Sequence, residues 1–158
     1  MRAEESLYEQ DFFAWTQSQA KELRRFARTR PNVPLDLAHI AEEIADLGKA
    51  EKNAVLSYAE RIIEHLLLLE HSPAQEPRRH WAREIRAFRR EVERHLTASL
   101  RRELRRRLPQ LYARLRRDLM ADMTAFGEVE AAARLPDRCP YTLDQILGDW
   151  FPDNADRE

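Results

Sequence analysis

The sequence has few of the residues that build disulfides, turns and strands. Its 158 residues include three glycines and a single cysteine, Cys139. One cysteine excludes an internal disulfide and a zinc site built from several cysteines. The scarcity of glycine, together with the lack of β-branched runs, predicts an all-α chain.

Long hydrophobic runs are also missing. No N-terminal apolar stretch has the length of a signal peptide, and the apolar run at 62–69 is too short to cross a bilayer. The mean hydropathy is −0.71, but 43% of the residues are hydrophobic, which is enough for a core. We therefore expect one all-helical domain over residues 1–158, located in the cytoplasm and without a membrane partner.

The longest uninterrupted helical pattern runs from Asp36 to Leu69, where apolar residues recur every three or four positions and no proline intervenes. Asp36 is a suitable N-cap, since its carboxylate can accept hydrogen bonds from first-turn amides. Gly48 marks either a close helix crossing or a bend. The sequence thus predicts a long central helix over about residues 36–70. Its expected apolar stripe is Leu37, Ile40, Ile44, Leu47, Val55, Tyr58, Ile62, Leu66 and Leu69.

Three further helices are expected to pack on this central helix. The first covers 7–28 and the next covers 79–96. The third begins at a cap at Ser99, and Pro109 should kink it or split it in two.

The C-terminal residues predict a short, very apolar helix. Thr142 and Gln145 have the spacing of a capping box, in which each side chain bonds to the other residue's backbone amide. Such an apolar segment must be covered, so we expect it to dock on the other helices. The predicted fold is a single-domain helical bundle around one long helix.

Charge is unevenly distributed although the net charge is only −1. Residues 1–77 sum to −5, residues 78–117 to +11, and residues 118–158 to −7. Two explanations remain open: a nucleic-acid surface on the basic segment, or helices that neutralise one another. We favour the second, because the acidic flanks nearly cancel the basic middle.

Three polar residues, Glu43, Glu51 and His65, lie on the predicted apolar stripe. They could belong to a carboxylate and histidine metal site of a helical bundle, or they could be structural, with carboxylates paired to Arg and a hydrogen-bonded core histidine. Glu43 and Glu51 are roughly 12 Å apart along a straight helix, too far to share one ion. The other helices offer no Glu-x-x-His pair. We therefore expect no metal site and no cofactor.

Residues across nearly the whole chain carry a family resemblance. They are Tyr8, Asp11, Trp15, Leu35-Asp36, Glu42-Glu43-Ile44, Leu47-Gly48, Glu51-Lys52, His65-Leu66-Leu67, Trp81, Ile85, Arg89, Tyr112, Cys139-Pro140-Tyr141-Thr142-Leu143 and Ile146-Leu147. In these positions the sequence resembles the bacterial domain of unknown function, family twenty-nine. It departs from the family pattern at Leu68, where the family tends to carry Lys, and at Ala98, where it tends to carry Pro. The resemblance implies an all-helical, cytosolic bacterial protein with no assigned activity.

The first functional hypothesis is a non-catalytic helical interaction protein that forms a homodimer. The sequence has no glycine-rich phosphate loop and no nucleophile beside a base, while it has an excess of apolar helical surface. We do not expect an enzyme. The candidate binding residues are Asp11, Trp15, Glu43, Glu51, His65, Trp81, Arg89 and Tyr112.

Two alternatives rank below the first. One is nucleic-acid binding through the Arg face of the helices within 79–126. The other is a dimeric ribonuclease of the helical-bundle type, in which Arg89 or Arg90 would act with His95. Arg is so frequent in this chain that the required Arg-to-His spacing is expected by chance, so the ribonuclease ranks last.

Overall fold

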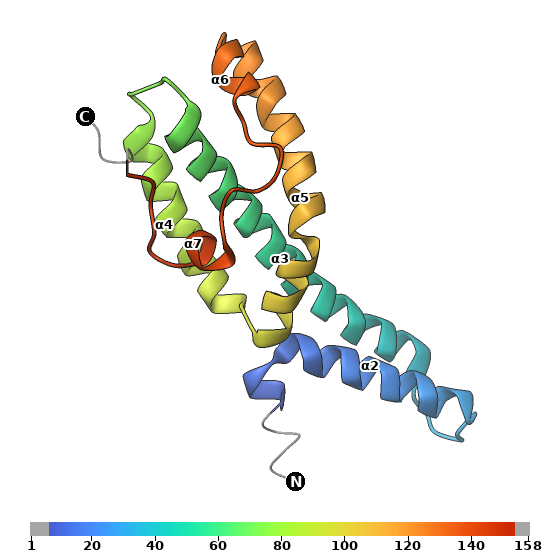
Figure 1. Ribbon diagram of the computed structural model, residues 1–158. Coiled ribbons are helices and arrows are strands. Elements are labelled where there is room, and N and C mark those ends of the chain that lie inside the picture. The colour runs from blue at the N-terminus through green and yellow to red at the C-terminus, as the bar shows by residue number, and fades with distance from the viewer. Residues whose placement is uncertain (1–6, 154–158) are drawn as a thin grey trace. The chain divides into compact units, whose positions relative to one another are not determined.

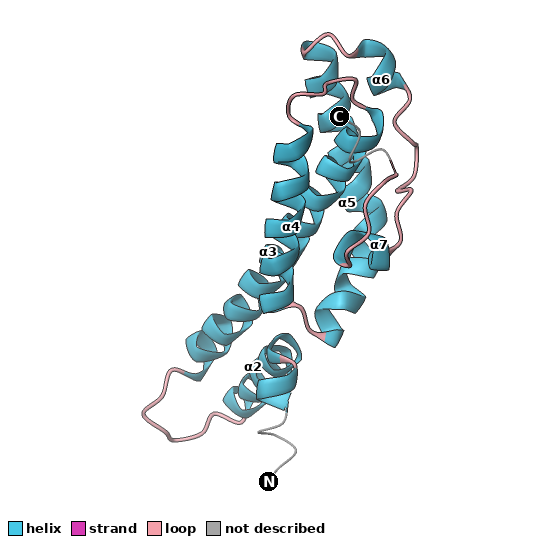
Figure 2. Cartoon of the chain, turned by 90° about the vertical axis from the view of Figure 1, so that its left-hand side faces the viewer, coloured by secondary structure: helices cyan, strands magenta, loops and turns pink. Residues whose placement is uncertain are grey.

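One long helix, α3 (Leu37–His71), dominates the computed structural model (Figure 1). The structure describes residues 7–153, and this part of the chain contains helices and loops but no strand (Figure 2). The amide of His39 donates to the Asp36 carboxylate at 3.3 Å, so Asp36 caps the helix as predicted. The all-α fold and the long helix are therefore confirmed. The other helices are α2 (Phe12–Arg28), α4 (Arg78–His95), α5 (Ala98–Ala125), α6 (Val129–Ala133) and α7 (Leu143–Leu147).

The chain forms two compact units, which we describe separately. Unit 1 consists of Met1–Ala54 and His95–Glu103, and unit 2 of Val55–Arg94 and Leu104–Glu158. The first half of α3 belongs to unit 1 and the second half to unit 2. The organisation of residues 1–158 as a single domain stays a prediction.

Unit 1 is built on a close crossing between α2 and the first half of α3, which lie side by side in both ribbon views (Figures 1 and 2). A Cβ atom on Gly48 would overlap the hydroxyl of Thr16 on α2. Thr16 is fully buried, and its hydroxyl donates to the carbonyl of Phe13 at 2.7 Å. Of the two roles expected for Gly48, the structure thus shows the close crossing.

Unit 2 packs the second half of α3 against α4 and α5. The turn at 66–69 in this half of α3 consists of four consecutive leucines and is therefore apolar on every side, so it needs cover from several helices. Its core contains, with exposures of 1% or less, Ile62, Ile63, Leu66, Leu67, Leu69, Ile85, Leu104 and Ile146.

The C-terminal segment docks on unit 2 through Arg89, a buried residue of α4. Its Nε donates to the carbonyl of Ile146 at 2.9 Å, and its Nη2 donates to the carbonyls of Gln145 and Trp150 at 2.8 and 2.7 Å. The guanidinium carbon also lies 4.9 Å from the centre of the Phe151 ring. The expected docking of the short C-terminal helix is confirmed, and Arg89 serves this docking.

The start of α7 and the start of α5 can be compared with the caps that the sequence predicts. Thr142 and Gln145 form the predicted capping box of α7. The prediction of a cap at Ser99 is wrong: α5 starts at Ala98, and the amide of Leu100 donates to the hydroxyl of Thr97 at 3.3 Å. Pro109 lies inside α5, and the helix continues through it, so the proline does not split the helix in two.

Replacing Gly48 by Ala should lower the free energy of unfolding by about 1–3 kcal/mol, although alanine is the better helix former. The reason is the overlap of the new methyl group with the Thr16 hydroxyl. Urea denaturation followed by circular dichroism measures the change. The double variant with Thr16→Ala and Gly48→Ala should recover part of the loss, and a G48A variant as stable as the wild type would contradict the close crossing.

Candidate functional site

Unit 1 leaves several large apolar side chains in solvent. Leu35 is 58% exposed, Leu47 54% and Phe26 45%, and Val33 and Ile40 are also exposed. They come from the end of α2, the connecting loop and the start of α3. Because five exposed apolar side chains fall within 26–47, on one hairpin, this part of unit 1 is a candidate interaction surface.

The exposure of Ile40 and Leu47 corrects the predicted apolar stripe. Leu37 of the predicted stripe is buried as expected, but Ala41 and Gly48 are the further residues buried there, in place of Ile40 and Leu47. A close crossing requires small residues at the contact, so α3 turns its small residues toward α2. The larger aliphatic side chains are thereby left on another face of the helix.

Glu43 lies between Ile40 and Leu47 in the sequence and is likewise exposed. The expectation that Glu43 is a buried carboxylate paired to Arg is therefore wrong. It is one of four acids within 36–47, a segment that contains no Lys or Arg. The start of α3 is thus an acidic face with exposed aliphatic residues.

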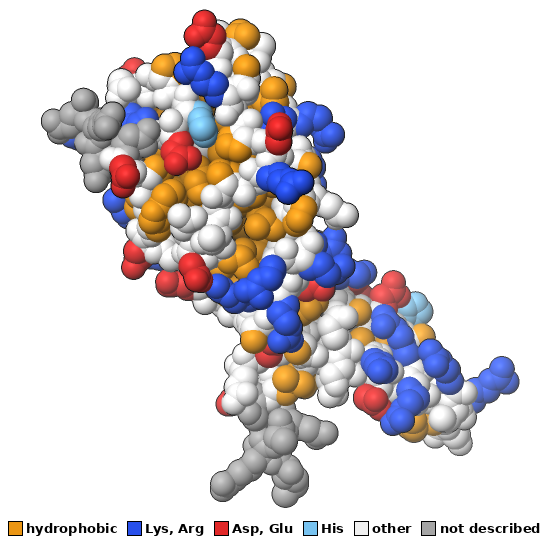
Figure 3. Space-filling view, in the orientation of Figure 1, with side chains coloured by type: hydrophobic (Ala, Val, Ile, Leu, Met, Phe, Trp, Pro, Cys, Tyr) orange, Lys and Arg blue, Asp and Glu red, His pale blue; other side chains and the backbone are white. Residues whose placement is uncertain are grey.

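The second half of α2 has the opposite charge. Lys21, Arg24, Arg25 and Arg28 are exposed there, with Glu22 as the one acid of the helix. Figure 3 shows Lys and Arg side chains gathered over this part of the chain. Within the described residues, Lys21, Arg24 and Arg28 form no ion pair, and Arg25 pairs with Glu22 of its own helix at 2.7 Å. On the acidic helix, Asp36 pairs with His39 at 2.6 Å and Asp46 with Lys49 at 2.9 Å, while Glu42 and Glu43 form no ion pair within the described residues. The hairpin therefore presents a basic helix and an acidic helix, and part of the charge on each has no partner of opposite charge there.

Asp11, a predicted binding residue, holds two helix ends of unit 1. Its carboxylate accepts from the amide of Ala14 at 3.0 Å, which caps α2. It also accepts from the amide and the hydroxyl of Ser99 at 2.9 and 2.6 Å, at the start of α5. Burial alone would raise the pKa of Asp11, but the hydrogen bonds from Ser99 and Ala14 lower it below its ordinary value. The role of Asp11 in the structure is to fix the backbone.

Trp15 belongs to an aromatic cluster beside Asp11. Its ring centre lies 4.8 Å from that of Tyr8 and 5.8 Å from that of Phe12. Tyr8 is 51% exposed, so one side of the cluster faces solvent. The cluster adds aromatic surface to unit 1.

Glu51 and His95 are brought together, 2.8 Å apart in unit 1, with both side chains about one-third exposed. Sequence spacing could not show this contact, because the two residues are 44 positions apart. The imidazole of His95 thus faces a carboxylate of α3, that of Glu51. Arg89 directs its guanidinium to the C-terminal carbonyls, and Arg90 is exposed.

The remaining predicted residues lie in unit 2. His65 shares a hydrogen bond of 2.7 Å with the carbonyl of Arg61, and its ring meets Phe88 edge-on. Tyr112 donates to the carbonyl of Pro136 at 2.6 Å, and burial raises its pKa to about 12. Trp81 lines a groove that we consider below. Within residues 7–153, no three His, Cys, Asp or Glu side chains are placed to hold a metal ion.

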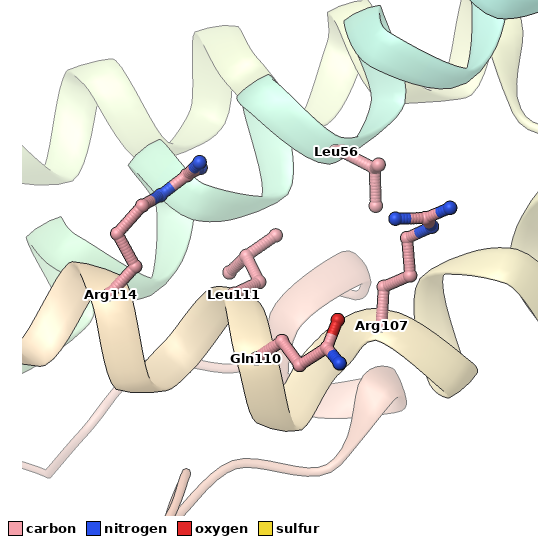
Figure 4. Close-up of a pocket in the computed structure, with 5 residues that line it drawn as sticks. All are labelled: Leu56, Arg107, Gln110, Leu111 and Arg114. Atoms are coloured by element: carbon pink, nitrogen blue, oxygen red, sulfur yellow. The ribbon is translucent and has the colours of Figure 1, made fainter.

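The arginines of α5 are largely engaged in the structure. Figure 4 shows Arg107 and Arg114 on either side of Gln110, over a small pocket of about 160 Å³. Arg114 donates to Glu60 of α3 at 2.8 Å. Arg116 donates to the carbonyl of Pro136 at 2.9 Å. These contacts favour the interpretation in which Arg side chains hold helices and loops together.

Comparison with known proteins places the chain in a family. The sequence pattern described as "Domain of unknown function DUF29" matches residues 7–151. The chain belongs to this family. The matched residues extend over both units, so the family pattern includes both of them. No curated protein matches the chain.

A crystal structure shows a similar fold. It is that of an alpha-helical protein of unknown function from Rhodospirillum rubrum, with 28% sequence identity and a TM-score of 0.76. The similarity covers 92% of this chain and 91% of that protein. Within the described residues, no helix of this DUF29 protein combines the length and the apolar character that a membrane span needs.

Replacing Asp11 by Asn should lower the free energy of unfolding at pH 7 by about 1–3 kcal/mol, because the amide NH₂ would then face the backbone N–H of Ser99 in place of the oxygen that accepts from it. The folded-state pKa of Asp11 lies below the ordinary value of 3.8, so its carboxylate stabilises the fold above that pH. The difference between wild type and D11N should therefore shrink as the pH falls through and below 3.8. Urea denaturation between pH 7 and pH 3 measures it.

Asp11→Ser is the matched control for this prediction. Serine can still cap α2, but it cannot reach Ser99 as well, so D11S should retain part of the stability. A difference between wild type and D11N that stays constant with pH would contradict the role of the ionised carboxylate.

Proposed function

We propose that this protein is a non-catalytic interaction protein of the bacterial cytoplasm that self-associates through its unit 1 hairpin. The surface comprises the exposed apolar residues Phe26, Val33, Leu35, Ile40 and Leu47, with the charged residues beside them. The observation that carries the proposal is that these exposed apolar residues lie on the same hairpin as a basic helix and an acidic helix.

The charges define how two copies would pair. In a two-fold dimer the same surface is used by both protomers, so each contact occurs twice. The basic half of α2 in one protomer would lie against the acidic start of α3 in its partner, and the reverse contact would form as well. Such a reciprocal arrangement neutralises both helices and fixes the orientation of the two hairpins.

The apolar residues supply the affinity. Covering the exposed half of a large apolar side chain contributes roughly 1 kcal/mol, and a dimer would cover ten of them, five from each protomer. Association costs about 4–15 kcal/mol in lost freedom of motion. The two quantities are similar in size, so we expect a dimer that dissociates on dilution.

Sedimentation velocity over a range of protein concentrations tests the proposal. The double variant with Leu35→Ser and Leu47→Ser should raise the dimer Kd about tenfold or more, because it removes apolar contact from both copies. Val129→Ser is the matched control: Val129 is 57% exposed but lies in unit 2, so V129S should dimerise like the wild type. A wild type that stays monomeric at all concentrations, or an equal effect of V129S, would overturn the proposed surface.

Charge reversal tests the orientation. A variant with Arg24→Glu and Arg28→Glu, and another with Glu42→Arg and Glu43→Arg, should each associate more weakly than the wild type. Mixing the two should restore association as a heterodimer, since both reciprocal contacts then join opposite charges. If the mixture associates no better than either variant alone, the pairing of α2 with α3 is wrong.

A further inference from the structure

Unit 2 contains a groove of about 520 Å³ that the proposed self-association does not use. Its walls come from the last turns of α3, the start of α4 and the last turns of α5. The apolar part of the wall includes Leu68, Trp81, Met123 and Phe126, and Phe126 is 86% exposed. This volume lies within the range of pockets that hold small organic molecules.

The polar part of the wall carries negative charge. Glu64, Asp122 and Glu128 line the groove, and none of the residues lining it is Lys or Arg. Glu128 accepts a hydrogen bond from the Ser72 hydroxyl at 2.8 Å, which fixes the position of its carboxylate. Glu64 pairs with Arg61 at 3.1 Å. The Asp122 side chain forms no hydrogen bond or ion pair within the described residues, so its charge is available to a ligand.

Helix ends of both polarities meet at the groove: the C-terminal ends of α3 and α5 and the N-terminal end of α4. Leu68 and Ser72 lie at the C-terminal end of α3, and Asp122 and Met123 lie in the last turn of α5. The C-terminal end of a helix carries a partial negative charge from its unpaired carbonyls. The N-terminal end of α4 carries the opposite partial charge, so the preference for a cation comes from the carboxylates of Glu64, Asp122 and Glu128.

We propose that the groove binds an organic cation with an apolar body, such as a protonated amine on an alkyl chain. The apolar body would contact Leu68, Met123 and the aromatic rings. The ammonium would lie near Asp122 and Glu128, and Trp81 adds an aromatic ring that attracts cations. Anionic ligands of the same shape are excluded by charge. This site belongs to unit 2 and is independent of the proposed dimer surface in unit 1.

Three probes of matched size test the charge requirement: octylammonium, octanol and octanoate. Titration calorimetry with the full chain should show octylammonium binding about tenfold more tightly than octanol, and no binding of octanoate. In the NMR spectrum, octylammonium should shift the indole resonance of Trp81, assigned through Trp81→Phe. Equal affinity for octylammonium and octanol, no binding of octylammonium, or an unmoved Trp81 resonance would overturn the proposal.

Two variants test the residues of the groove. Asp122→Asn should weaken octylammonium binding about threefold to tenfold and leave octanol binding unchanged. Asp118→Asn is the matched control, one turn earlier on α5 and outside the groove, and it should bind like the wild type. Phe126→Ala should weaken the binding of both octylammonium and octanol, because it removes apolar contact with the alkyl chain. Asp122, Asp118 and Phe126 are exposed, so circular dichroism should show unchanged folding. An equal effect of D118N and D122N would contradict the site.

Discussion

The close contact of α2 with α3 at Gly48 determines what unit 1 can present to other molecules. Because the Thr16 hydroxyl occupies the space that a side chain would fill at residue 48, only a small residue fits there. The helix therefore directs Ala41 and Gly48 inward, and Ile40 and Leu47 stay partly in solvent. The apolar surface of the hairpin follows from this steric constraint.

The second half of α3 is packed differently from the first half. Its leucines are buried on most sides, and α4, α5 and the C-terminal segment provide the cover. Arg89 fixes that segment by donating hydrogen bonds to three of its backbone carbonyls. These carbonyls are buried or partly buried, and the hydrogen bonds from Arg89 satisfy them. On the face shown in Figure 3, hydrophobic side chains gather around this segment of unit 2. The basic helix α4 thus uses the guanidinium of Arg89 to hold the fold together.

Sequence reasoning succeeded where the chemistry is local. Asp36 and Thr142 cap helices through hydrogen bonds to residues three positions away, so their roles can be read from spacing. It failed for Ile40, Leu47 and Glu43, because the buried side of a helix depends on which neighbour packs against it. A 3.6-residue period identifies the helix and several possible faces, and the small residues at the crossing select one of them. The groove of unit 2 joins three helices that are distant in sequence, so no local pattern indicated it.

The central claim is that one continuous helix uses its first half for association and its second half for the core. Hydrogen exchange of the α3 amides, measured by mass spectrometry at low and high protein concentration, tests this claim most directly. Protection of residues 37–47 should rise with concentration, while protection of residues 55–71 should stay constant. Protection that is independent of concentration in both halves, or that rises equally in both, would contradict the account.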